Sequence, residues 1–198
     1  MAISAADVKA LRERTGAGMM DCKHALVEAG GDSDKAVTIL REKGVAAASK
    51  KISREAKEGV IHTYIHPGSR IATMVELNCE TDFVARNDMF QSLARDIAMQ
   101  VAATKPQAVG REQMSQGLVD EESEIYRNQA KNEGKPDTII DRIIQGRIEK
   151  FYQENCLLEQ PFIRDTDKTV KDLITDAVGT LGENIQIRRF IRYELGGE

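Results

Sequence analysis

The hydrophobic period of this chain changes near Gly59, and this change limits the possible folds more than any other feature of the sequence. Before Gly59, apolar residues recur at the three- and four-residue spacing of helices. From Gly59 the period shifts to two, which is the period of a strand. Helical spacing returns from residue 88. This order predicts an α+β fold in which helices pack on a small antiparallel sheet.

Residues 1–45 are predicted to form three short helices. Their apolar stripes are preceded by capping residues and followed by glycines, which are the usual boundary signals of helices. We expect the three helices to end at Gly16, Gly30 and Gly44. Helices of this length enclose only a small core, so we interpret the region as a compact three-helix module and not as an enzyme domain. Residues 46–58 are polar and locally basic, and we interpret them as a linker.

Residues 59–198 are predicted to form one α+β core domain that also mediates dimerisation. Val60–His66 and Arg70–Cys79 flank Pro-Gly-Ser, as the strands of a hairpin do. The β-branched and aromatic segment Asn184–Leu195 predicts a third strand. Amphipathic helices are expected over residues 88–104, 119–132, 137–156 and 168–181. The core is therefore expected to hold a three-stranded antiparallel sheet packed by helices.

Composition and charge exclude several functional classes. The 198-residue chain has a formal net charge of −4, whereas nucleic-acid-binding proteins usually carry a basic domain or stripe. We see neither a signal peptide nor an apolar stretch long enough to span a bilayer, so we expect a cytoplasmic protein without a membrane partner. The three cysteines lie far apart and outside any C-x-x-C spacing, so we expect buried, reduced thiols at Cys22, Cys79 and Cys156.

The sequence carries no recognised motif of covalent chemistry. Phosphate-binding loops, dinucleotide-binding turns, nucleophile elbows and zinc-protease helices are all missing. His62 and His66 would share one face of a regular strand, but a metal ion would need a third ligand, and the sequence names none. We therefore expect a binding protein without cofactor or metal rather than an enzyme.

Two long segments carry most of the family-specific information. Residues 11–26 read LRERTGAGMMDCKHAL, and residues 76–87 read ELNCETDFVARN. Both resemble signatures of bacterial elongation factor Ts, in the same order and at the same spacing, and the resemblance extends over essentially the whole chain. The chain looks like the short form of that family. The resemblance implies a UBA-like N-terminal module and exchange of guanine nucleotide on the translational GTPase elongation factor Tu. It also implies binding to the GDP-bound and nucleotide-free partner, and a homodimer formed through the core domain.

The resemblance also implies roles for individual residues. The family inserts one segment near the partner's Mg²⁺ site and disturbs the phosphate loop, and this segment corresponds to Thr81, Asp82, Phe83 and Val84. The N-terminal module is expected to contact the partner through Arg12, Met19 and Met20, since methionine adapts to irregular surfaces. The last strand offers three dimer-interface candidates or core residues, which are Phe190, Ile191 and Tyr193.

Residue spacing leaves two of these assignments open. Phe83 lies seven residues before Phe90, so in one unbroken helix it would join the buried stripe. A cap at Asn87 would instead start the helix later and leave Phe83 free to act as a wedge. Met19 and Met20 are open in the same way, because they are suited to the interior of the module as well as to a partner surface.

Two other functions compete with nucleotide exchange. The first is a three-helix adaptor fused to a scaffold domain, which would bind a partner without changing its nucleotide kinetics. The second is an enzyme whose site is assembled from scattered acids together with His62 and His66. Neither explains why two long segments resemble one family.

Overall fold

The computed structural model describes residues 3–197, which divide into two compact units. The first unit holds the described residues up to Val60, together with Leu77–Leu93 and Asp172–Gln186. The second holds Ile61–Glu76, Ala94–Lys171 and the described residues from Ile187 onward. Each unit is thus assembled from three separate stretches of the chain. The domain boundaries expected from the sequence, 1–45, 46–58 and 59–198, stay a prediction.

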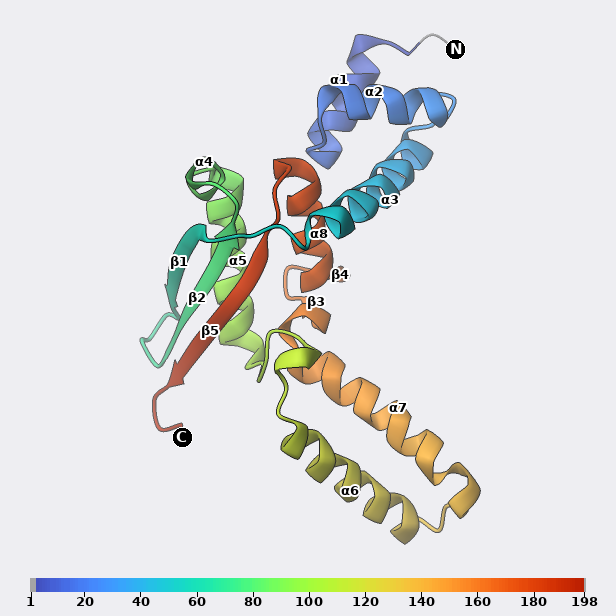
Figure 1. The fold of residues 1–198 in the computed structure, drawn as a ribbon, viewed down its shortest axis with the longest axis vertical. Helices are drawn as coiled ribbons and strands as arrows, with labels where there is room; N and C mark the ends of the chain where they lie inside the picture. Colours follow the sequence, from blue (N-terminus) through green and yellow to red (C-terminus); the bar gives the residue numbers. More distant parts are fainter. Residues whose placement is uncertain (1–2, 198) are drawn as a thin grey trace. The chain divides into compact units, whose positions relative to one another are not determined.

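The N-terminal part of the first unit is a three-helix module (Figure 1). It consists of α1 (Ala5–Thr15), α2 (Met19–Glu28) and α3 (Ser33–Lys51). Ser4 and Asp7 form a capping box at the start of α1, and the Asp32 side chain caps α3. The module encloses one small core formed by Val8, Leu11, Cys22, Ala25, Leu26 and Ala36. This arrangement matches the expected helices, apart from the end of the third.

The third helix does not end at Gly44, and that expectation was wrong. Helix α3 continues through Gly44 to Lys51. A glycine ends a helix when it takes a left-handed conformation, as Gly16 does with φ of 70°. Gly44 instead stays helical, and a Cβ at Gly179 of helix α8 (Val170–Leu181) would lie 3.6 Å from its Cα. Its lack of a side chain therefore suits close packing between two helices, and the alanine-rich run that follows favours further helix.

The sheet has the expected three strands. Its members are β1 (Glu58–Ile65), β2 (Ile71–Cys79) and β5 (Gln186–Glu194), in the order β1-β2-β5. The His66 N–H donates to the Ile71 carbonyl and closes the β1–β2 hairpin. The Leu195 N–H donates to the Arg70 carbonyl, so the end of β5 lies beside the start of β2, as in an antiparallel pair. The α+β class with a three-stranded antiparallel sheet is confirmed.

Helix α5 (Asp88–Thr104) covers one face of this sheet in the second unit (Figure 1). The Thr73 hydroxyl of β2 donates to the Ala98 carbonyl at 2.9 Å, and Arg192 Nε of β5 donates to the Ala102 carbonyl at 3.2 Å. The predicted apolar stripe of this helix is buried, and it comprises Phe90, Leu93, Ala94, Ile97, Ala98 and Val101.

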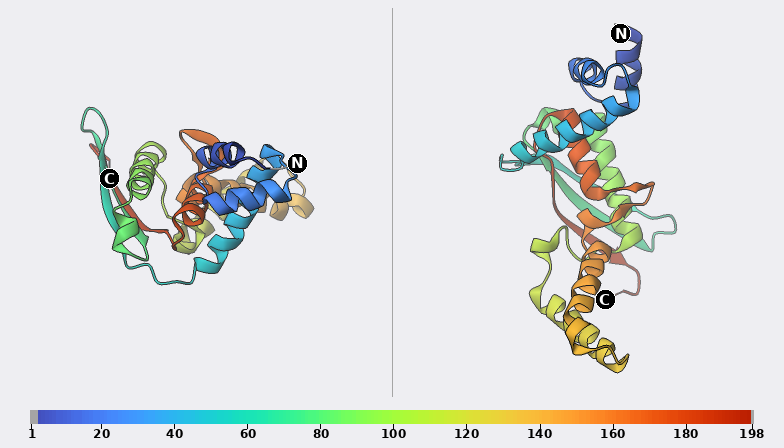
Figure 2. Two further views of the ribbon diagram at one scale, coloured as in Figure 1. Left: turned by 90° about the horizontal axis from the view of Figure 1, so that it is seen from above. Right: turned by 90° about the vertical axis from the view of Figure 1, so that its right-hand side faces the viewer.

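Helices α6 (Gln116–Asn132) and α7 (Asp137–Asn155) form a hairpin in the second unit, and they lie side by side in Figure 2. Their shared core consists of Ala130, Ile140 and Ile144. Helix α8 starts at Val170, because residues expected at its start belong instead to β4 (Asp165–Thr169), which pairs with β3 (Pro161–Phe162). Other short elements that the sequence did not predict are α4 (Asp82–Ala85), η1 (Arg111–Gln113) and η2 (Leu157–Glu159).

Candidate partner-binding site

The segment Thr81–Val84 connects the end of β2 to the start of α5 and carries an exposed phenylalanine. Residues Asp82–Ala85 form the one-turn helix α4. Asn87 then starts a separate helix, because its Oδ1 accepts the Met89 N–H at 2.9 Å. The break keeps Phe83 off the buried stripe: Phe90 is fully buried, whereas Phe83 is 82% exposed. Phe83 is therefore not a core residue of this chain.

Hydrogen bonds fix the turn that carries Phe83. Thr81 is the N-cap of α4, and its Oγ1 accepts the Val84 N–H at 3.4 Å. The same hydroxyl donates to Glu183 Oε1 at 2.6 Å. Glu183 Oε2 accepts the backbone N–H groups of Glu80 and Thr81, each at 3.0 Å. A four-residue helix does not persist in water unaided, so these contacts are what orders it.

Asp82 lies beside Phe83 but is already paired. Its Oδ2 is 2.9 Å from Arg86 NH2, one turn further along the chain. Among the residues that the structure describes, no three His, Cys, Asp or Glu side chains come together as a metal site. Asp82 can therefore offer one carboxylate to a partner, and a single carboxylate is a poor chelator of a divalent cation.

Arg12, Met19 and Met20 lie on the surface of the N-terminal module. Met19 and Met20 form the start of α2 and are 46% and 57% exposed, so they do not fill the module's interior. Arg12 belongs to the last turn of α1 and is exposed. Its neighbour Arg14 pairs with Asp34 at 2.8 Å, whereas Arg12 makes no ion pair within residues 3–197. The three side chains thus leave a cation and two flexible apolar groups open to a partner.

The sheet face opposite α5 carries exposed apolar side chains together with one ion pair, which joins Arg189 Nε to Glu76 Oε2 at 2.7 Å. Side chains alternate along a strand, and the inward positions are identified by the contacts of Thr73 and Arg192 with α5. The outward positions of β5 are therefore those of Ile191 and Tyr193. The exposed large side chains on this face are Ile61, Ile65, Met74, Ile191 and Tyr193.

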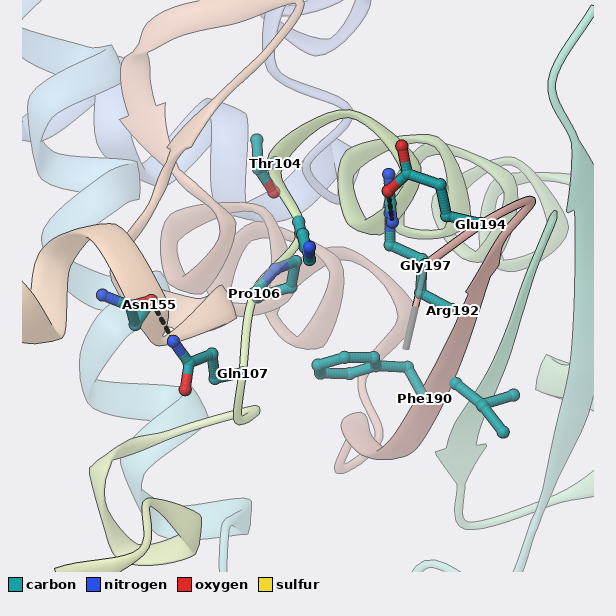
Figure 3. Close-up of a pocket in the computed structure, with 10 residues that line it drawn as sticks. Thr104, Pro106, Gln107, Asn155, Phe190, Arg192, Glu194 and Gly197 are labelled. Atoms are coloured by element: carbon teal, nitrogen blue, oxygen red, sulfur yellow. Dashed lines mark hydrogen bonds and ion pairs between the residues drawn. The ribbon is translucent and has the colours of Figure 1, made fainter. Parts of the chain in front are cut away.

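Phe190 points to the other side of β5 and lines a pocket (Figure 3). Thr104, Pro106 and Gln107 form the opposite wall. The polar groups of this pocket are largely paired with each other: Gln107 donates to Asn155 Oδ1 at 2.9 Å, and Arg192 donates to Glu194 at 2.6 Å. Of the three interface candidates on the last strand, Ile191 also borders this pocket, whereas Tyr193 does not.

The two strand histidines do not form a site. Burial, together with the positive charge of Arg95, lowers the pKa of His62. His66 Nδ1 instead lies 3.1 Å from the Tyr64 hydroxyl. Neither histidine joins a group of potential metal ligands in the described part of the chain. No helix described there is long and apolar enough to cross a membrane.

Sequence reasoning missed two residues that follow α8: Glu183, which is hydrogen-bonded to Thr81, and Asn184, which is hydrogen-bonded to the preceding Glu80. Asn184 is buried, and its N–H donates to Glu80 Oε1 at 2.6 Å. The only local signal is Gly182, whose φ of 81° ends the helix and turns the chain. A helix end predicts no specific partner about a hundred residues earlier in the chain.

Comparisons with known proteins agree on one family. A model described as "Elongation factor TS" matches residues 27–197. The elongation factor Ts of Desulforamulus reducens is 60% identical over 194 residues, covering 98% of this chain and 89% of that protein. That of Moorella thermoacetica is 59% identical over 98% of this chain and 96% of that protein. That of Carboxydothermus hydrogenoformans is 61% identical over 96% of this chain and 87% of that protein.

Proposed function

The chain belongs to the elongation factor Ts family of translation elongation, and from this premise we propose that it is the guanine-nucleotide exchange factor for elongation factor Tu. It binds the GDP complex, inserts Thr81–Val84 beside the Mg²⁺ and phosphate-loop site, and thereby releases GDP. GTP then binds the emptied site. No covalent bond changes in this cycle, so the protein acts by binding and not as an enzyme of covalent chemistry.

Differential binding must supply the acceleration. A GTPase that holds GDP with nanomolar affinity binds it by about 12 kcal/mol, so spontaneous release is slow. Raising the release rate ~10³–10⁴-fold requires the activation free energy of release to fall by roughly 4–5.5 kcal/mol. A factor without reactive groups provides this only by binding the distorted, nucleotide-free partner better than the GDP-bound one. By linkage, bound nucleotide then lowers the partner's affinity for the factor by as much as the bound factor lowers the partner's affinity for nucleotide.

The exposure of Phe83 on a capped turn is the observation that carries this proposal. Because the ring lies in water in the free protein, its burial against the partner yields a gain of roughly 1.5–3 kcal/mol. That gain covers part of the requirement. The remainder comes from a wider interface, to which Arg12, Met19 and Met20 contribute from the N-terminal module.

Asp82 supports the insertion without capturing the metal. Its ion pair with Arg86 holds the side chain along the turn. We assign the displacement of Mg²⁺ to distortion of the partner's site by the whole segment, since one carboxylate cannot replace the ligand set of that ion.

We also propose that two copies of this chain pair through the exposed sheet face. Ile61, Ile65 and Tyr193 lie on this face and are more than half exposed. A second copy would present the same face, as a two-fold symmetric dimer requires. Pairing of this kind would remove from water an apolar surface that a monomer leaves open.

Stopped-flow release of a fluorescent GDP analogue from elongation factor Tu tests the function. We expect saturating protein to accelerate release ~10³–10⁴-fold. Phe83→Ala should lower the saturating rate constant about 10–100-fold, the kinetic equivalent of one buried phenylalanine. Its melting temperature should not change, because Phe83 has no core contacts to lose. The control Ile139→Ala removes an exposed apolar side chain from α7 and should release GDP at the wild-type rate. An unchanged rate constant for Phe83→Ala would rule out the wedge.

A further inference from the structure

The turn after α8 is hydrogen-bonded to two separate segments of the first unit. Helix α8 ends at Leu181, and Gly182 takes a left-handed conformation that redirects the chain. Glu183 then reaches the segment that carries Phe83, and Asn184 reaches the segment that follows α3. We name the pair Glu183 and Asn184, together with Glu80, the clasp.

Glu183 acts on the Phe83 turn through a continuous set of hydrogen bonds. One carboxylate oxygen accepts both the Glu80 and Thr81 N–H groups at 3.0 Å, and the other accepts the Thr81 hydroxyl at 2.6 Å. Because the hydroxyl donates its hydrogen bond to Glu183, an oxygen lone pair is left to accept the Val84 N–H. Glu183 thereby selects the Thr81 rotamer that caps α4. It does not itself reach Phe83.

Asn184 and Glu80 extend the clasp to the segment after α3. The Asn184 side-chain amide donates to the Arg54 carbonyl at 2.7 Å and to the Ile52 carbonyl at 3.4 Å. Glu80 Oε1 accepts the Asn184 N–H and lies 3.5 Å from Arg54 NH1. The segment leaving the N-terminal module and the segment carrying Phe83 are thus bonded to the same turn.

We propose that Glu183 is a positioning residue for nucleotide exchange, which orders the Thr81–Val84 turn before the partner is met. This inference rests on the proposed function. A turn that is already ordered presents Phe83 without paying its ordering entropy during insertion. Loss of Glu183 therefore slows the insertion step, whereas initial binding through the N-terminal module is retained.

Stopped-flow GDP release over a range of factor concentrations separates these two steps. We expect Glu183→Ala to lower the saturating rate constant about tenfold, as expected for losing the order of roughly one residue. The concentration at half-saturation should change less than about threefold. Glu183→Gln keeps one oxygen for the Glu80 and Thr81 N–H groups, but its NH2 group cannot accept the Thr81 hydroxyl, so it should recover only part of the rate. The matched control is Glu149→Gln, which removes a carboxylate bonded twice by Arg111 in the second unit and should release GDP at the wild-type rate.

A double-mutant comparison distinguishes positioning from general stabilisation. If Glu183 acts through the Phe83 turn, Glu183→Ala should slow release about tenfold in the wild type but little in a Phe83→Ala background. Amide hydrogen exchange should quicken at Val84 and stay unchanged in the middle of α5. Equal slowing in both backgrounds would overturn the proposal, as would unchanged kinetics of Glu183→Ala.

Two outcomes keep this proposal distinct from the proposed function. If the wild-type protein does not accelerate GDP release, the exchange function itself fails. If the wild type accelerates GDP release and Phe83→Ala slows it, but Glu183→Ala releases GDP at the wild-type rate, only the positioning role fails. If Glu183→Ala does not fold, Thr81→Val tests the proposal instead, because it removes the hydroxyl that is hydrogen-bonded to Glu183 at nearly constant side-chain volume. Because both backbone N–H bonds to Glu183 remain, it should lose less of the saturating rate than tenfold, and an unchanged rate would overturn the proposal.

Discussion

At the residue scale, Phe83 differs from the other phenylalanines of the chain. Phe90, Phe151 and Phe162 are buried, and Phe190 is half-buried in its pocket, whereas Phe83 is exposed. Exposed single apolar residues are common, and exposure by itself would carry little weight. What distinguishes Phe83 is that several hydrogen bonds order a one-turn helix whose main exposed group is this ring. The same turn buries Ala85 in the chain's own core and holds the Phe83 ring in water.

The cysteines give a prediction at the same scale. All three are free and buried, as the sequence predicted. Burial, with Glu183 next in effect, raises the pKa of Cys79 to about 11, and burial followed by Glu159 raises that of Cys156 to about 11. All three thiols are buried, and the raised pKa keeps Cys79 and Cys156 largely protonated at pH 8, so a disulfide-exchange reagent at this pH should label none of the cysteines in the folded protein and all three in denaturant. Rapid native labelling of Cys156 would contradict the buried placement.

At the element scale, helix α2 has exposed residues at its start that can serve binding and a buried residue that serves stability. Met19 and Met20 are exposed while Leu26 of the same helix is buried. Replacing both methionines by alanine should weaken binding to elongation factor Tu roughly tenfold, about 0.7 kcal/mol for each truncated side chain. Its melting temperature should fall by no more than about 2 °C. Leu26→Ala is the matched contrast, and it should cost about 2–5 kcal/mol of folding stability. A large loss of melting temperature in the double variant would place the methionines in the core.

The elements also show what a sequence can predict. Helix α5 has the predicted bounds because its apolar stripe is long and regular and Asn87 is a good cap. The helix end predicted at Gly44 was wrong because glycine occurs both at helix ends and where two helices pack closely. Helix α4 was missed because four residues carry no period. The role of Glu183 depends on Thr81, 102 residues earlier. No local sequence pattern predicts a hydrogen bond across that separation.

At the scale of the whole molecule, the first unit is completed by residues far apart in sequence. Lys51 at the end of α3 donates to the Val178 carbonyl of α8, and Arg41 pairs with Asp172. Closing a long loop costs entropy, so we expect such long-range contacts to form late in folding. We therefore expect the Phe83 turn to reach its final form only after α8 is in place.

The exposed sheet face allows a prediction about assembly. At micromolar concentration, light scattering should give about twice the 22.0 kDa mass of one chain. Ile191→Lys would bury an uncompensated charge in the paired face, so dimerisation should weaken at least about 100-fold and the mass should fall to that of one chain. Because Ile191 is exposed in the single chain, its melting temperature at low concentration should change little. Ile139→Lys on α7 is the control and should stay dimeric. A wild-type protein that scatters as one chain would show that this face serves another partner or none.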